Sequence, residues 1–218
     1  MARLFTYTIP YDDGAAPNPF NGLCTLAICK PRIRSAATAG DWVAGLGAKG
    51  APSGDLSGKL VYAMRVCEKL TLEQYDARCR AEWPARIPET NSLNLQDRLG
   101  DCIYDYSTGH PKLRPSVHCQ ENIETDLGGG YVLIAEEFYY FGGKAIALPE
   151  HLLGLCHQTQ GHKSNSNNEL LSPFVQWIRS LGHKPGLMHG WPDHIVNWED
   201  GVASNGCSIR VQAANGDC

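Results

Sequence analysis

His118 and Asp126 are the residues of this chain whose types and spacing best suit proton transfer. With Asn122 between them they are spaced four residues apart, so they share one face if the segment is helical. A histidine beside a carboxylate is a suitable general base with its orienting group. The alternative is an ordinary polar network in a loop, which the glycines at 128–130 favour. We predict His118 and Asp126 as candidate catalytic residues.

A second polar group, His162 and Lys163, directly follows Gly161. A glycine frees the backbone to bring neighbouring side chains close to a ligand. Histidine exchanges protons near neutral pH, and lysine can hold a phosphate as a compact cation. We therefore predict His162 as a further catalytic candidate and Lys163 as a nucleotide-binding residue.

Residues 18–47 combine a rigid turn, short apolar strands and cations, and we interpret them as one wall of a ligand site. Asn18 belongs to the rigid turn, because each residue before a proline is kept out of the helical region. Lys30 and Arg34 lie on either side of Pro31, where cations could contact phosphate. The alternative is a solvated charged face. We predict Asn18, Lys30 and Arg34 as nucleotide-binding residues.

Asp41 and Trp42 open a glycine-flanked strand and suit recognition of a nucleobase. A carboxylate can accept a hydrogen bond from an exocyclic amine, and an indole can stack on the base. The alternative is a turn aspartate that caps a backbone amide beside a core tryptophan. Tyr140 lies between two other aromatic residues on a predicted strand, where alternate side chains face opposite sides. We predict Asp41, Trp42 and Tyr140 as further nucleotide-binding residues.

The nine cysteines are odd in number and form no C-x-x-C pair. This pattern indicates reduced thiols rather than a disulfide framework or a zinc knuckle. Cys24 and Cys29 would be nucleophiles only beside a base, which the sequence alone does not place, and buried unreactive thiols are the alternative. His183, His189 and His194 lack the helix that commonly fixes metal ligands. We predict no metal and no cofactor.

The composition indicates a folded domain. The 218 residues are 43% hydrophobic and 19% charged, which excludes a disordered or coiled-coil protein. The net charge of −4 excludes a protein that coats DNA, so any nucleic-acid contact must come from a local patch or pocket. The N-terminus is too polar for a signal peptide, and no apolar run reaches about 18 residues. We predict a cytoplasmic protein without membrane contact.

Alternating hydrophobic residues and turn residues predict strands at 3–9, 23–29, 42–46, 59–70, 101–106, 131–141 and 145–148. Thr71 and Gln74 fit a capping box that starts a helix. A second helix is predicted with Ser172 as N-cap and Pro173 at its first position. Strands outnumber helices, which predicts an α+β fold with a mostly antiparallel sheet. We predict a single domain over residues 1–182 and an extended tail over 183–218.

Several short motifs in combination resemble a known family. The motifs are Asn18-Pro19-Phe20, the segment 24–31, Gly40-Asp41-Trp42, Tyr139-Tyr140-Phe141-Gly142 and Gly161-His162-Lys163. Together they resemble nucleotide modification associated domain 2, over roughly residues 3–182. The resemblance implies a bacterial or phage protein encoded beside DNA base-modification genes. It also implies DNA or a nucleotide as partner, together with other DNA-modification enzymes.

The segment from Gly40 to Val43 is more loosely similar to PUA-like barrels, the class that contains EVE, ASCH and YTH domains. Such domains hold one modified or flipped base between aromatic walls, so the similarity implies a PUA-like barrel sheet. Two hypotheses follow: a protein that binds a nucleotide and catalyses a step of its modification, or a non-catalytic reader of a modified base. A scaffold subunit of a modification complex is the third. The residues leave open whether any reaction takes place.

Overall fold

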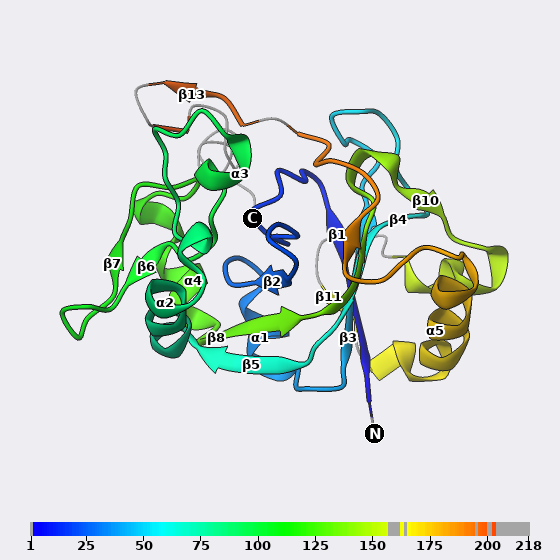
Figure 1. The fold of residues 1–218 in the computed structure, drawn as a ribbon. Coiled ribbons are helices and arrows are strands. Elements are labelled where there is room, and N and C mark those ends of the chain that lie inside the picture. Colours follow the sequence, from blue (N-terminus) through cyan, green and yellow to red (C-terminus); the bar gives the residue numbers. More distant parts are fainter. Residues whose placement is uncertain (1, 157–161, 164, 195, 200–201, 204–218) are drawn as a thin grey trace.

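The structure is a computed structural model that describes residues 2–156, 162–163, 165–194, 196–199 and 202–203. Two β-sheets form its frame, and Figure 1 shows the larger one edge-on in the middle of the molecule. Most helices and small hairpins lie on one side of the large sheet, and the last α-helix lies on the other. The site described below lies beside the smaller sheet, on the side of the large sheet that carries most of the helices.

The large sheet has the order β11 (His162–Lys163), β1 (Leu4–Ile9), β3 (Trp42–Gly47), β4 (Lys59–Arg65), β9 (Glu137–Tyr140) and β12 (Leu187–Met188), with β10 (Ile146–Ala147) also paired to β4. Only the β1–β3 and β9–β12 pairs among these are parallel. Gly45 of β3 lies opposite Tyr62 of β4. A Cβ atom at Gly45 would lie 2.5 Å from the Tyr62 ring, so this close approach requires glycine.

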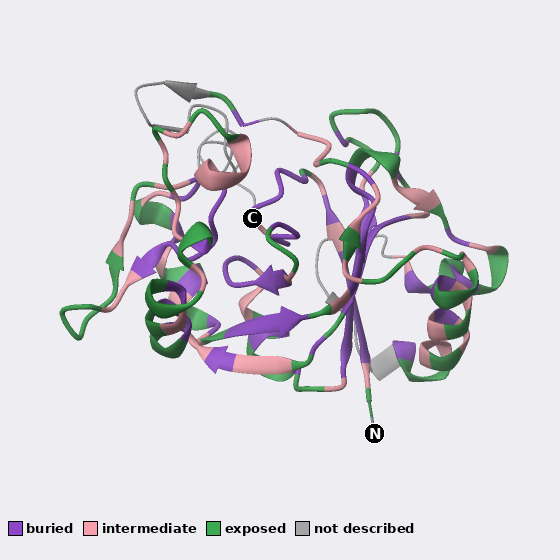
Figure 2. Ribbon diagram, viewed as in Figure 1, coloured by how far each residue is buried: buried purple, intermediate pink, exposed green. Residues whose placement is uncertain are grey.

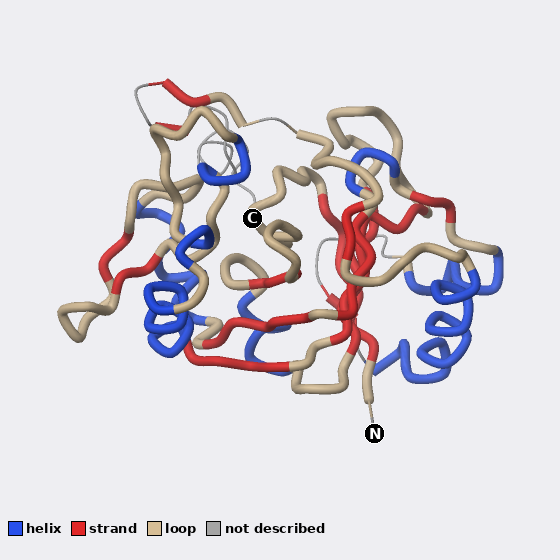
Figure 3. The backbone as a smooth tube through the Cα atoms, viewed as in Figure 1, coloured by secondary structure: helices blue, strands red, loops and turns tan. Residues whose placement is uncertain are grey.

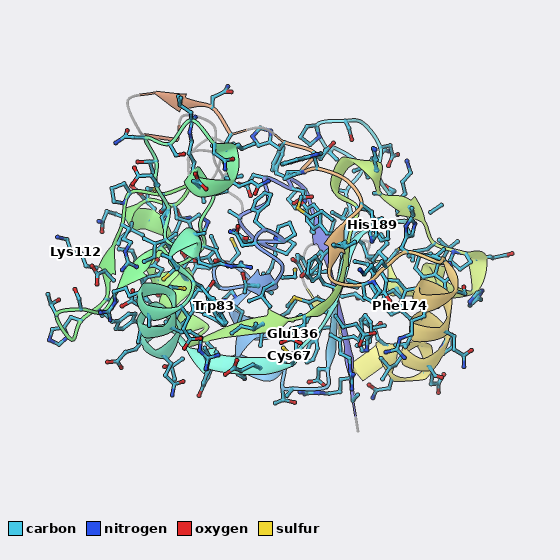
Figure 4. The ribbon with its side chains drawn as sticks, in the orientation of Figure 1. Cys67, Trp83, Lys112, Glu136, Phe174 and His189 are labelled. Carbon is cyan, nitrogen blue, oxygen red and sulfur yellow. The ribbon has the colours of Figure 1, made fainter. Side chains whose placement is uncertain are left out.

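The smaller sheet has the order β2 (Cys24–Leu26), β8 (Tyr131–Ala135) and β5 (Glu68–Thr71), and its pairs are antiparallel. Two chain segments run through both sheets, because β4 leads into β5 and β8 leads into β9. Figure 3 shows the change of direction between the sheets, and Cys67 and Glu136 mark it in Figure 4. The single strands predicted at 59–70 and 131–141 are therefore each two strands.

The helices flank these sheets. They are α1 (Pro31–Ala36), α2 (Leu72–Ala81), α3 (Leu95–Arg98), α4 (Ile123–Gly128) and α5 (Leu171–Ser180), with 3-10 turns η1 (Pro84–Arg86), η2 (Gln120–Asn122), η3 (Gly142–Lys144), η4 (Glu150–Leu155) and η5 (Asn165–Leu170). The predicted capping box is confirmed, because Thr71 and Gln74 each accept a hydrogen bond from the other's backbone N–H. The predicted cap of α5 is wrong: the helix begins at Leu171, directly after η5, and Ser172 lies inside it.

Short strands complete the described structure as two hairpins, β6 (Tyr104–Asp105) with β7 (Lys112–Leu113) and β13 (Trp198–Glu199) with β14 (Val202–Ala203). The large sheet is buried on both faces, as the purple strands of Figure 2 show. Phe5, Tyr7 and Tyr140 belong to a core between the two sheets. Trp42 and Phe174 belong to a second core beneath α5. A third core lies around α2 and the first hairpin.

The predicted α+β class with mostly antiparallel sheets is confirmed. Within the described residues the large sheet ends at β11 and β12 without closing, so a PUA-like barrel is not confirmed. The strand β12 lies beyond residue 182 and yet pairs with β9, while the predicted domain boundary itself stays a prediction. No described helix combines the length and the apolar character needed to cross a membrane.

Candidate active site

The turn after β2 holds Cys29 in an unusual backbone conformation. The strand predicted to reach residue 29 ends at Leu26, and Cys29 and Lys30 have φ angles of 55° and 41°. Positive φ is uncommon for residues other than glycine, and such strained positions concentrate at functional sites. Pro31 then begins α1, because its fixed φ suits the first helical position. A strand, a strained residue and a helix thus place Cys29 at a sharp turn.

His118 and Asp126 approach Cys29 from the segment that contains α4. His118 Nε2 lies 3.5 Å from Cys29 Sγ, and His118 Nδ1 lies 2.6 Å from Asp126 Oδ2. Asp126 Oδ1 accepts a hydrogen bond from the Cys29 N–H at 2.8 Å, and the Tyr104 hydroxyl donates to Oδ2 at 3.0 Å. One ring nitrogen therefore faces the thiol while the carboxylate orients the other. This is the arrangement of an activated nucleophile with its base.

All three residues are buried. Asp126 has no exposed surface, His118 is 5% exposed and Cys29 is 7% exposed. Burial by itself would lower the pKa of His118, but the negative charge of Cys29 and the contact with Asp126 raise this pKa well above its usual value. Burial would raise the pKa of Asp126, but the bond and charge of His118 lower it. Both shifts favour an imidazolium at His118 paired with the Asp126 carboxylate.

The same three residues also satisfy a distance requirement for metal ligands, since their sulfur, nitrogen and oxygen atoms lie within 4.8 Å of one another. The orientation of Asp126 does not suit a shared ion. Its oxygens bond to His118 Nδ1 and the Cys29 N–H, whereas Sγ faces Nε2 on the other side of the ring. A metal at Nε2 would therefore receive two ligands from this group, fewer than zinc normally takes. Nucleophilic chemistry fits the geometry better.

The structure brings His118 and Asp126 together, as the sequence predicts, but not on one helix. His118 precedes η2 whereas Asp126 lies on α4, so their pairing depends on the turn between them. Arg34 also reaches this cluster, where it donates to backbone carbonyls. Lys30 is half-buried, with Nζ 5.0 Å from the centre of the Tyr7 ring. Roles in catalysis or nucleotide binding stay predictions for all four candidates.

Asp41 and Trp42 make contacts within the protein. Asp41 accepts hydrogen bonds from Arg3 and from the Thr38 N–H. Burial would raise the pKa of Asp41, but the bonds from Arg3 lower it. Trp42 is 3% exposed, and its ring packs against the ring of Phe174, a residue of α5 (Figure 4). These contacts match the alternative of a turn aspartate beside a core tryptophan. The Trp42 ring is covered by the fold, so a base could not stack on it without a rearrangement.

Asn18 and Tyr140 are also buried and hydrogen-bonded. The Asn18 amide donates to the Leu99 carbonyl at 2.8 Å and accepts from Arg86 at 3.0 Å. The Tyr140 hydroxyl donates to Asp12 Oδ2 at 2.6 Å, and burial raises the pKa of Asp12 to about 7. Each predicted nucleotide-binding residue in this pair thus already has a partner inside the protein, and a ligand contact there stays a prediction.

His162 and Lys163 form β11, an edge strand of the large sheet. The backbone of His162 pairs with Tyr7 and that of Lys163 with Thr6. This pairing places the backbone of His162 and Lys163 beside β1, whose Tyr7 ring lies under Lys30 Nζ. The side chains of His162 and Lys163 lie outside the described part of the structure, so their predicted roles stay predictions.

The sequence names Cys24 and Cys29 as possible nucleophiles but does not decide between them. The one local signal for Cys29 is its position just before Lys30-Pro31, where a strand must stop. The imidazole that faces it belongs to a residue 89 positions later in the chain, so the base becomes visible only after folding. Tyr104 and Asp12 have no recognisable motif either, although the Tyr104 hydroxyl donates to the buried Asp126 carboxylate and the buried Asp12 carboxylate accepts from the Tyr140 hydroxyl.

Comparison with known families gives one match. A family model described as nucleotide modification associated domain 2 matches residues 1–199. The resemblance inferred from short motifs over roughly residues 3–182 is thereby confirmed, over a longer stretch of the chain. No curated protein and no solved structure matches the chain. The family description associates this fold with nucleotide modification.

Proposed function

Because the chain belongs to the nucleotide modification associated domain 2 family, we propose that it is a cysteine-dependent enzyme that transfers an acyl group to or from a nucleotide. The single observation that carries this proposal is the thiol–imidazole–carboxylate chain. Cys29 Sγ lies 3.5 Å from His118 Nε2, whose partner nitrogen lies 2.6 Å from Asp126. The same constellation performs acyl transfer on unrelated folds, where it is recognised by geometry and not by sequence order.

The reaction has two steps. In the first, the Cys29 thiolate attacks the carbonyl carbon of an acyl donor, a carbon–sulfur bond forms, and the leaving group departs with the Nε2 proton of His118. In the second, an amine or hydroxyl of the acceptor gives its proton to Nε2, attacks the thioester carbon and releases the thiolate. Asp126 keeps the imidazole oriented and stabilises its positive charge in both steps.

A nucleotide in DNA or in free form is the proposed donor or acceptor. Lys30 directly follows the nucleophile, and its Nζ lies over the Tyr7 ring at 5.0 Å. The edge strand β11 pairs with β1, and its His162 lies opposite the same tyrosine. Lys30, predicted to hold phosphate, and His162, predicted for proton transfer, thus come from segments that both meet Tyr7. This placement supports a phosphorylated substrate beside Cys29.

The reader hypothesis has less support. A PUA-like reader would stack a base on an exposed ring, and its predicted ring, Trp42, is packed against Phe174 with 3% of its surface exposed. Nor does a reader require a thiol held against an imidazole. Loss of DNA or nucleotide binding in Trp42→Ala, without any turnover in the wild-type protein, would restore the reader hypothesis.

The decisive comparison is wild-type protein against Cys29→Ser, with Cys67→Ser as the matched control. Cys67 is exposed and lies at the bend between the sheets (Figure 4). DNA is incubated with each protein and lysate metabolites, and its nucleosides and the Cys29 peptide are analysed by mass spectrometry. We expect a changed nucleoside and a trapped acyl adduct on Cys29 in wild-type and Cys67→Ser protein, and neither in Cys29→Ser. Conversion that persists in Cys29→Ser would overturn the proposal.

A further inference from the structure

Arg34, on α1, is fully buried, and in the described part of the chain its hydrogen bonds all lead to backbone carbonyls. Nε donates to the Cys29 carbonyl at 2.6 Å, and the two terminal nitrogens donate to the Asp126 carbonyl at 2.5 Å and the Tyr131 carbonyl at 2.8 Å. The planar guanidinium holds these donors in one fixed fork. It therefore joins the turn of the thiol to the helix of the carboxylate.

The space around this fork is tight. A Cβ atom at Gly129 would lie 2.4 Å from Arg34 Cζ, whereas a Cβ atom at the preceding Gly128 would meet nothing within 4 Å. A methyl group at position 129 must therefore displace the guanidinium, and one at position 128 need not. The two glycines give a pair of substitutions that differ in this contact.

The charge of Arg34 also bears on the thiol. Burial lowers the pKa of Arg34, while the negative charges of Asp126 and Cys29 oppose this shift. With Arg34 and His118 as cations and Asp126 and Cys29 as anions, the cluster has no net charge. Without Arg34 two buried anions would share one cation, and a thiolate at Cys29 would be disfavoured.

We propose that Arg34 is the positioning residue of the Cys29 site: it fixes the nucleophile's turn against Asp126 and balances the second negative charge. The inference rests on the proposed function, because it concerns the same thiol. In this role Arg34 acts through backbone carbonyls and does not touch the substrate. Its N–H groups are then not free to hold phosphate, which separates it from the predicted nucleotide-binding residues.

The groups that face the thiol come from each element packed around it. They are His118 and Asp126 from the α4 segment, Tyr104 from β6 through its bond to Asp126, Tyr7 from β1 and Arg34 from α1, with Lys30, just before α1, over the Tyr7 ring. Any change in the pH dependence of Cys29 therefore has to be compared across variants that leave the other five groups in place.

The test is the pH dependence of Cys29 alkylation by iodoacetamide, followed by peptide mass spectrometry because other thiols also react. Arg34→Gln removes the charge and the fork, Arg34→Lys keeps the charge, and Arg32→Gln removes an exposed cation from the same helix. We expect Arg34→Gln to move the profile to higher pH by about one unit, about tenfold slower at neutral pH. Arg34→Lys should recover part of this loss, and Arg32→Gln should match wild type.

Gly129→Ala and Gly128→Ala decide the matter if Arg34→Gln does not fold. Gly129→Ala should slow alkylation and Gly128→Ala should not, with circular dichroism confirming that both fold. Equal rates in the two glycine variants, or an unchanged profile in folded Arg34→Gln, would overturn the inference. A wild-type Cys29 that does not react at neutral pH would instead overturn the proposed function, whatever the Arg34 variants do.

Discussion

Two of the buried ionic clusters in the described part of the protein each take residues from the stretch around β2. The arginine cluster consists of Arg86, Asp101, Thr25, Tyr75 and Asn18. The thiol cluster consists of Cys29, His118, Asp126, Tyr104 and Arg34. In both, a tyrosine hydroxyl donates to a buried carboxylate and an arginine donates to backbone carbonyls. The same kinds of residue therefore build both clusters.

The clusters differ in how their reactive atoms are bonded. Arg86 donates to Asn18, Thr25 and two backbone carbonyls, and burial raises the pKa of Asp101 although Arg86 lowers it. In the thiol cluster, Cys29 Sγ has a loose 3.5 Å contact with an imidazole and keeps some exposure. Buried charge alone thus indicates packing, whereas a loosely bonded thiol beside an imidazole indicates chemistry.

The largest expected effect on stability lies in the arginine cluster. Arg86→Met should lower the free energy of unfolding by about 3–5 kcal/mol, because Asp101 would stay buried without its cation. Arg78→Met removes a partly exposed pair with Glu68 and should cost under about 1 kcal/mol. Urea denaturation measures both losses. If the two variants lose similar free energies of unfolding, the comparison fails, because the buried cluster would then stabilise the fold no more than a surface ion pair does.

His118→Gln should cost less, about 1–3 kcal/mol, because it leaves the Asp126 carboxylate without one hydrogen-bond partner. The folded pKa of His118 lies above its ordinary 6.5, so its contribution to stability is complete below pH 6.5 and is lost as the pH rises through the folded pKa. The stability difference between wild type and variant should therefore shrink in alkaline solution. Urea denaturation across pH measures it, and a difference that grows with pH would contradict the assigned ion pair.

The acid side of the same experiment has the opposite sign. The folded pKa of Asp126 lies below its ordinary 3.8, so its contribution is present above pH 3.8 and is lost as the pH falls through the folded pKa. The stability difference between wild type and His118→Gln should therefore be measured above pH 3.8, where Asp126 is charged in both the folded and the unfolded wild-type protein.

The smallest effects come from the two tyrosine hydroxyls. Tyr75→Phe should cost about 1–2 kcal/mol of stability and leave the alkylation profile of Cys29 unchanged, because among the described residues its hydroxyl bonds only Asp101. Tyr104→Phe should cost about 1 kcal/mol but also shift that profile, because Asp126 loses a donor. The pair sharpens the comparison: profiles that respond equally to both changes would show that the two clusters are not separate.

Local patterns in the sequence predict local structure well here. The capping box of Thr71 and Gln74 forms as expected, because it depends on residues three positions apart. The cap of α5 differs, because a 3-10 turn leads directly into that helix and moves its start before Ser172. The long strands are split at Cys67 and Glu136 because each segment contributes one strand to each sheet. Alternation along the chain does not encode this change of sheet.

The sequence by itself determined the family and the α+β class, and it named His118 and Asp126 as candidate partners, because motifs, turn residues and a short separation along the chain carry that information. Only the tertiary structure decided that Cys29 contacts this pair and that Arg34 donates to the backbone carbonyls of Cys29 and Asp126. The contacts of Cys29 and Arg34 with the α4 segment cross 89 to 97 positions of sequence and depend on how β2, α1 and α4 pack together. No local pattern fixes such packing, since it is set by the burial of the whole core.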